Sequence, residues 1–210
     1  NEWFVSRVFN NIPKNKEPAN IIVLDAHHLN TSNKLIEYND ILTNIHVPNP
    51  CSYEMCMISK GARKHITQTG RINLYKLPLY DFMMQVKHTI HGAWFDYTSQ
   101  IYTSSNELVD FFTHKSMIEK WPLHSFIIAY TYTWAHSYKY KKDIEHERKT
   151  AWSSMMQQIL KKNKNISFEF LTPTEPIESG VTPFDFEIKT NDGRIASPIQ
   201  GIHYGHQMDM

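Results

Sequence analysis

The chain has 210 residues, of which 41% are hydrophobic and 20% are charged, a balance that suits one domain with a single core. Lys and Arg number 22 against 21 Asp and Glu, so the net charge of +1 argues neither for nor against a polyanion partner, and any nucleic-acid site must be a local patch. No apolar run reaches the roughly 18 residues of a membrane span, and no signal-peptide pattern opens the chain. We therefore expect an intracellular, cytoplasmic protein.

Strand-like and helix-like patterns alternate through the first half of the chain. Residues 2–12 carry apolar side chains at a spacing near 3.6, which predicts a short amphipathic helix. Each β-rich apolar run after it is followed by a helical pattern. The expected strands cover residues 20–25, 44–47 and 71–76, and the helices behind them cover 31–37, 53–62 and 79–86.

The same alternation continues in the second half and then changes. Strands are expected over 91–96, 123–133 and 166–171, and helices over 107–119 and 138–162. After a proline-rich loop, strands over 184–189 and 194–197 flank the hairpin turn Asn191-Asp192-Gly193, with a last strand over 204–210. This order predicts a three-layer α/β sandwich whose sheet is mostly parallel, with an antiparallel C-terminal edge.

The cysteines and histidines predict no metal site. Cys51 and Cys56 form a lone C-x4-C pair, which indicates structural thiols and excludes a disulfide framework. The 12 histidines show no H-E-x-x-H or comparable ligand spacing.

The stretch from His91 to Thr98 (HGAWFDYT) has the pattern most typical of a functional site. An apolar run there delivers Asp96, Tyr97 and Thr98 where a buried strand is expected to end. Ligands of open α/β sheets gather beyond the carboxyl ends of such strands. The alternative interpretation is that Asp96 caps the following helix or turn and Tyr97 packs beneath it.

The order of elements resembles that of the class I, Rossmann-like methyltransferases that use S-adenosylmethionine. Five strand–helix units followed by a hairpin-like end match over nearly the whole chain. The resemblance implies one Rossmann-like methyltransferase domain over 1–210, with an N-terminal helix and linker over 1–19 and a C-terminal loop and hairpin over 172–210. The first motif departs from the family, because residues 21–26 (IIVLDA) lead into 27–32 (HHLNTS) without the glycines that let the backbone approach the cofactor.

The resemblance also implies S-adenosylmethionine as the cofactor and a set of residues that bind it. In the first motif, the Asp25 carboxylate and two hydroxyls would hold the polar end of the cofactor, although a carboxylate after a strand often only caps the next helix. Asn49 falls where the family binds the ribose, and the segment from Lys76 flanks the adenine. The full set is Asp25, Ala26, His27, Thr31, Ser32, Asn49, Lys76 and Leu77.

Asp96 and Tyr97 fall at the fourth-strand motif of the family. In methyltransferases that act on amino nitrogens this motif is commonly Asp or Asn, two prolines and an aromatic residue, and the prolines are missing here. The resemblance implies that Asp96 orients the acceptor or takes up its proton and that Tyr97 stacks on a planar base. We expect a nucleic-acid base, in RNA or DNA, or another amino group as acceptor. The basic clusters 139–142 and 161–164 fit phosphate binding, but also fit a solvated helix face.

Two other functions remain open. Without the glycines, the chain fits an inactive methyltransferase-like subunit that acts as a scaffold or binding module in a larger assembly. Its protein partners would then meet an aromatic surface formed by Trp121, Tyr130, Tyr132, Trp134 and Tyr138, although these aromatic residues fit a core equally well. A minor alternative is a metal-dependent nuclease, since 185–189 (DFEIK) resembles the Asp and Glu-x-Lys pattern of such enzymes, although plain strand patterning also gives this alternation.

Overall fold

The structure is a computed structural model that describes residues 2–12, 17–25, 28–37, 43–62, 71–122, 126–133, 153–171 and 184–204. The helices are α1 (Glu2–Asn11), α2 (Asn30–Glu37), α3 (Ser52–Ala62), α4 (Leu79–Gln85), α5 (Ile101–Thr113), α6 (Lys115–Ile118) and a further one over 153–162. The strands are β1 (Ala19–Val23), β2 (Thr43–Pro48), β3 (Arg71–Tyr75), β4 (Gly92–Gln100), β5 (Phe126–Thr133), β6 (Ile166–Leu171), β7 (Phe184–Thr190) and β8 (Ile195–Tyr204).

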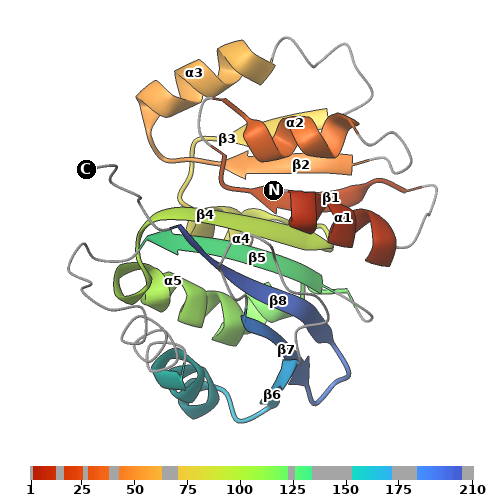
Figure 1. The fold of residues 1–210 in the computed structure, drawn as a ribbon, viewed down its shortest axis with the longest axis vertical. Coiled ribbons are helices and arrows are strands. Elements are labelled where there is room, and N and C mark those ends of the chain that lie inside the picture. Colours follow the sequence, from red (N-terminus) through yellow and green to blue (C-terminus); the bar gives the residue numbers. More distant parts are fainter. Residues whose placement is uncertain are drawn as a thin grey trace.

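These strands form one eight-stranded sheet in the order β3-β2-β1-β4-β5-β8-β7-β6 (Figure 1). Neighbours from β3 through β8 pair in parallel, whereas β7 runs opposite to both β8 and β6. The predicted mostly parallel sheet with an antiparallel C-terminal edge is confirmed. The chain extends from β1 toward β3 on one side and from β4 toward β5 on the other, so β1 and β4 flank the topological switch point.

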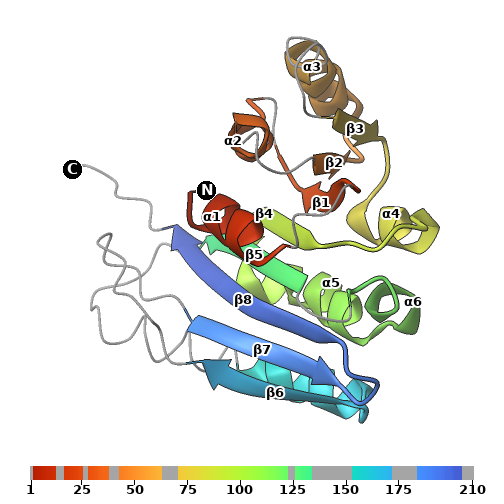
Figure 2. The same ribbon diagram turned by 90° about the vertical axis from the view of Figure 1, so that its right-hand side faces the viewer.

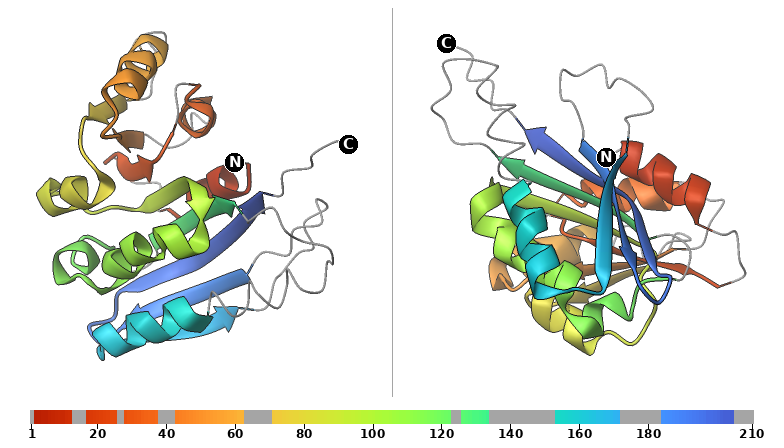
Figure 3. Two further views of the ribbon diagram at one scale, coloured as in Figure 1. Left: turned by 90° about the vertical axis from the view of Figure 1, so that its left-hand side faces the viewer. Right: turned by 90° about the horizontal axis from the view of Figure 1, so that it is seen from below.

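Helices cover both faces of the sheet and give it three layers. Figure 2 shows α1, α2 and α3 on one side and α4, α5 and α6 on the other. The helix over 153–162 lies beside β6 on the second side, as Figure 3 shows. Strand β1 is buried on both faces, because Ile21 and Val23 join the core under α1 to α3 while Ile22 joins the core under α4 to α6. This two-sided burial explains its continuous apolar sequence.

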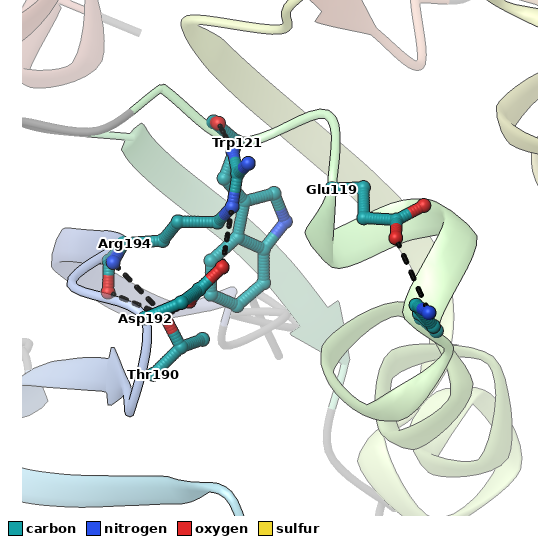
Figure 4. A network of polar contacts seen from close by, with 6 residues as sticks. Glu119, Trp121, Thr190, Asp192 and Arg194 are labelled. Carbon is teal, nitrogen blue, oxygen red and sulfur yellow. Dashed lines mark hydrogen bonds and ion pairs between the residues drawn. The ribbon is translucent and has the colours of Figure 1, made fainter.

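The predicted turn between β7 and β8 is present and is tied to the body of the domain. The Gly193 N–H donates to the Thr190 carbonyl at 3.0 Å, and Gly193 has a φ of 87°, which glycine adopts without steric cost. The Arg194 guanidinium donates to the Asp192 carboxylate at 3.1 Å and to the Trp121 carbonyl at 2.5 Å (Figure 4). The hairpin is therefore anchored to the segment that follows α6.

Several predicted bounds are wrong because strand pairing continues further than the sequence pattern. Strand β4 does not end at Asp96: after an irregularity its pairing with β5 resumes at Gln100, and α5 begins at Ile101 instead of residue 107. The helix expected over 107–119 is interrupted at His114, between α5 and α6.

The end of the chain also differs from the prediction. The strands expected over 194–197 and 204–210 belong to the single strand β8 as far as residue 204, because β8 pairs with β5 along this length. Residues 205–210 lie outside the described part of the chain. Of the helix expected over 138–162, the part over 153–162 is described, and its predicted inner residues Met155, Met156 and Ile159 are buried.

Two predictions about the environment of side chains are corrected by the structure. Trp121, expected in an exposed aromatic interface, is 1% exposed. Its ring packs edge-on against the Phe112 ring, with 6.1 Å between the ring centroids. The side chains of Tyr130 and Tyr132 are not described, and residues 134 and 138 lie outside the described part. Cys51 and Cys56 are free and exposed, so neither thiol belongs to the core.

Of the helices described, none combines the length and apolar character of a membrane span.

Candidate functional site

Two carboxylates interact at the switch point: Asp25 follows the carboxyl end of β1, and Asp96 lies within the neighbouring strand β4. Val23 of β1 pairs with Trp94 of β4, and the Leu24 N–H donates to the Trp94 carbonyl at 2.9 Å. Asp25 and Asp96 follow these paired positions by two residues each. Asp96 is exposed, Asp25 is 6% exposed, and the negative charge of Asp96 contributes to the raised pKa of Asp25.

The Asp25 carboxylate binds the start of α2. One oxygen accepts the Thr31 N–H at 3.2 Å, and the other accepts the Ser32 N–H at 2.8 Å and the Ser32 hydroxyl at 2.6 Å. Backbone N–H groups in the first turn of a helix have no partner within the helix, so this carboxylate serves as their cap. Burial raises the pKa of Asp25, and the hydrogen bonds from Ser32 and Thr31 partly offset this effect.

The turn into α2 is made without glycine in the described part of the loop. Leu29 has a φ of 52°, in the left-handed region, yet its side chain is only 1% exposed and packs in the core under α1 to α3. The Asn33 N–H donates to the Leu29 carbonyl at 2.8 Å and closes the first helical turn. Burial of the leucine side chain offsets the backbone cost of this conformation.

At the carboxyl end of β2, Asn49 is held at two points. Its N–H donates to the Tyr75 carbonyl at 2.9 Å, and its Oδ1 accepts the Cys51 N–H at 2.8 Å. These bonds leave the Nδ2 of Asn49 without a partner among the described residues. After β3, Lys76 is exposed and Leu77 packs partly buried against the core under α4 to α6.

A polar network crosses β1, β2 and β3 on the α4 side and was not predicted from the sequence. His46 is 3% exposed; its Nδ1 lies 3.0 Å from the Tyr75 hydroxyl and its Nε2 lies 3.2 Å from Asn20 Oδ1. Asn20 Oδ1 also accepts from the Asn44 amide at 3.3 Å. Burial, with a smaller contribution from His88, lowers the pKa of His46 to about 4. The signal in the sequence is the alternation of polar and apolar residues over 44–47, which places Asn44 and His46 on one face.

The structure brings five of the predicted site residues to one edge of the sheet. Four of them, Asp25, Asn49, Lys76 and Leu77, follow the carboxyl ends of the parallel strands β1, β2 and β3, and the fifth, Asp96, lies within β4 beyond its pairing with β1. Thr31 and Ser32 are buried, with their N–H groups directed to Asp25. Tyr97 lies in β4, but its side chain is not described, and Ala26 and His27 lie outside the described residues.

The nuclease-like motif lies elsewhere, on β7. Lys189 Nζ pairs with Glu187 Oε1 at 2.6 Å, and Glu169 of β6 lies opposite Glu187 in the register. Within the described ranges, no three His, Cys, Asp or Glu side chains gather as metal ligands do. The motif is therefore an ion-paired segment of an antiparallel pair of strands, remote in the sheet order from β1 and β4.

Comparison with solved structures shows which fold this is. A Streptococcus mutans protein assigned as a methyltransferase and solved with SAH matches with a TM-score of 0.50 and 12% identity, over 89% of this chain and 94% of that one. The chain has a class I methyltransferase fold. Two rRNA methylase structures also match: one from Clostridium thermocellum (assigned; TM-score 0.49, 9% identity, 84% and 88% coverage) and one from Streptococcus thermophilus (0.44, 11%, 88% and 90%). No family model and no curated protein sequence matches.

The class I methyltransferase fold indicates why the sheet edge at β1 and β4 is the candidate site. In sheets of this topology the crevice beyond the switch point is where ligands bind. In this chain the strands at that point carry an exposed carboxylate, Asp96, and a buried one, Asp25, and Asn49 follows the end of the next strand, β2. These groups are the candidate site.

Proposed function

We propose that this chain transfers a methyl group from S-adenosylmethionine to an amino nitrogen, with a nucleic-acid base as the first acceptor class to test. The observation that carries the proposal is the arrangement of Asp25 and Asp96 at the switch point of a class I methyltransferase fold. Fold alone does not define an activity, so the proposal depends on whether the residues at this edge suit the cofactor and the reaction.

The adenosine side of the cofactor suits the β2 and β3 ends. Asn49 presents amide N–H donors, which pair with hydroxyl oxygens such as those of a ribose. Leu77 offers a half-buried apolar side chain beside the exposed Lys76, in the position expected to flank a planar ring.

The methionine side of the cofactor meets a different environment. The first N–H groups of α2, which attract carboxylates in many proteins, are already bonded to Asp25. Two neighbouring carboxylates favour positive charge, and the sulfonium and ammonium groups of the cofactor both carry it. We therefore expect Asp25 and Asp96 to favour the charged centre of the cofactor, with the cofactor carboxylate bound away from the start of α2.

The reaction asks little acid–base strength of the protein. S-adenosylmethionine, when bound, supplies a methyl group already activated on sulfur. Asp96 accepts a hydrogen bond from the acceptor amine and so directs the nitrogen lone pair toward the methyl carbon. Asp96 or solvent would take the proton that the amine gives up, and the carbon–sulfur electron pair would be left on sulfur as the methyl group leaves the cofactor. Tyr97 would stack on the ring of a base acceptor.

The test is a calorimetric titration of the purified chain with S-adenosylmethionine and with S-adenosylhomocysteine. Micromolar binding would support the proposal, and methyl-labelled cofactor would then be supplied with RNA, single-stranded DNA and protein acceptors in parallel. No binding at millimolar ligand would overturn it.

An inactive subunit is the second candidate, and one observation favours it. Asp25 uses the hydrogen-bonding capacity of the α2 start within the chain, so this helix start is stable without any ligand. A scaffold would show this self-contained bonding together with no stabilisation by either cofactor form, whereas an enzyme gains thermal stability from both.

A further inference from the structure

The hydrogen bonds of the polar network continue as far as the proposed cofactor edge. Asn20 Oδ1 can only accept, so His46 Nε2 carries the proton of that bond and His46 Nδ1 accepts from the Tyr75 hydroxyl. The assignment of the Asn20 amide is supported by its Nδ2, which donates to the Thr89 carbonyl at 3.0 Å. The neutral, Nε2-protonated form of His46 therefore satisfies both of its neighbours at once.

Tyr75 connects this network to the carboxyl edge of the sheet. It is the last residue of β3, and its ring meets Phe82 of α4 at 4.6 Å and His46 at 5.7 Å between centroids. Its hydroxyl binds His46, and its carbonyl accepts the Asn49 N–H at 2.9 Å. One residue thus joins a side chain fixed inside the domain to the backbone that carries Asn49.

The Asn49 side chain is directed by the same contacts. Because its Oδ1 accepts the Cys51 N–H, the orientation of the carboxamide is determined and the Nδ2 donors face away from the start of α3. A donor at this place suits the oxygen of a bound hydroxyl group. Its usefulness depends on how firmly residue 49 is held, since small displacements of a positioning group weaken binding strongly.

We propose that Tyr75, fixed by His46 and Phe82, is a positioning residue for the cofactor: it holds Asn49 where the Asn49 amide binds a ribose hydroxyl of the adenosine moiety. This inference rests on the proposed function, because the ligand is the same cofactor. Asn49 makes the contact, and Tyr75 and His46 act through it.

The test is a double-mutant cycle between Tyr75→Phe and Asn49→Ala, read as affinity for S-adenosylhomocysteine by calorimetry. Tyr75→Phe keeps the ring and removes the hydroxyl that binds His46, and we expect it to weaken binding by about three- to tenfold. In the Asn49→Ala background the same change should have almost no effect, because the group that Tyr75 positions is gone. Tyr80→Phe removes a phenol hydroxyl from the exposed side of α4 and should leave affinity unchanged.

The outcomes separate the two proposals. Wild-type protein that binds no S-adenosylhomocysteine overturns the proposed function and this inference with it. If wild-type protein binds S-adenosylhomocysteine, two results overturn the positioning role and leave the proposed function in place. In the first, Tyr75→Phe does not change the affinity. In the second, it weakens binding equally in the wild-type and the Asn49→Ala backgrounds. A lower melting temperature of Tyr75→Phe without loss of affinity would likewise assign Tyr75 to stability alone.

Discussion

The two halves of the candidate site are built in opposite ways. On the β1 side, Asp25 is buried and its oxygens accept two N–H groups and a hydroxyl of α2. On the β2 side, Asn49 is held by its backbone N–H and its Oδ1, and its Nδ2 has no bond to any described residue. The polar groups of the first half are bonded within the chain, whereas the second half leaves an N–H donor for a ligand. We therefore expect the β2 side to provide selective hydrogen bonding to the ligand, and the side of Asp25 and Asp96 to provide electrostatic attraction.

The difference also shows how each half is stabilised. The β1 side depends on a helix cap and on a buried leucine in the left-handed region, which are local devices within residues 25–33. The β2 side depends on a network that joins three strands and α4. Changes on the β1 side should therefore act mainly on one helix, whereas changes in the network should affect several elements together.

The sharpest division between catalysis and binding is expected at Asp96. Asp96→Ala should lower the methyl-transfer rate by about 100-fold or more, while affinity for S-adenosylhomocysteine stays within about threefold, because the residue is assigned to the acceptor. Transfer assays and calorimetry on the same preparation measure the two effects. Asp110→Ala, an exposed carboxylate that pairs with Lys162 at 3.0 Å, is the matched control. Equal losses of rate and affinity would place Asp96 on the cofactor side.

Acid should destabilise the β2 side through His46. Its pKa is about 4 in the fold against 6.5 for an unperturbed histidine, so below pH 6.5 the unfolded chain gains a proton that the folded chain does not. Stability should fall between pH 6.5 and 4, by at most about 3 kcal/mol from this group. The facing groups are Tyr75, Asn20 and His88, and burial also lowers the pKa of His91, which adds a smaller loss in the same direction.

Urea unfolding of wild type and His46→Gln across this pH range isolates the histidine. Glutamine keeps one donor and one acceptor and does not titrate, so its stability should depend less steeply on pH. The same pH dependence in both proteins would mean that other groups cause the acid sensitivity.

On the β1 side, Asp25→Ala should cost about 1–2 kcal/mol of stability, because the first N–H groups of α2 lose their cap. We also expect weaker cofactor binding, since the variant removes a carboxylate beside Asp96. Thermal unfolding and calorimetry measure both, and Asp25→Asn serves as the control that keeps an acceptor oxygen but removes the charge. Lower stability of Asp25→Ala with wild-type affinity would leave Asp25 as a helix cap only.

The smallest expected effect lies outside both halves, in the β7–β8 turn. Gly193→Ala should cost about 1 kcal/mol, because the φ of 87° is unfavourable for alanine. An added methyl group meets no atom within 4 Å, so the cost comes from the backbone alone. Gly193→Asn should cost less, since asparagine tolerates this region. Chemical denaturation measures the difference in the free energy of unfolding. A changed cofactor affinity in either variant would contradict the assignment of cofactor binding to the β1 and β2 sides alone.

Local patterns predicted most elements because the forces that define them act within a few residues. The apolar side chains within residues 20–25 predict a strand because they fill both faces of a buried strand. Residues 191–193 predict a turn because asparagine, aspartate and glycine suit its backbone. The order of such segments also predicted the fold class. Strand ends were less accurate, since the length of β4 depends on where β5 lies beside it.

The sequence by itself determined the alternation of strands and helices, the apolar cores on both faces of the sheet and the strand ends that Asp25 and Asn49 follow, because each follows from hydrophobic periodicity and parallel topology. Only the tertiary structure decided what those side chains do there. Asp25 caps α2, Trp121 is buried, and His46 joins Asn20 and Tyr75 across three strands. The helix cap of Asp25 was one of two interpretations that the local pattern allowed, whereas the bonds of His46 join residues 26 and 29 positions apart, and no local pattern specifies which of those will meet.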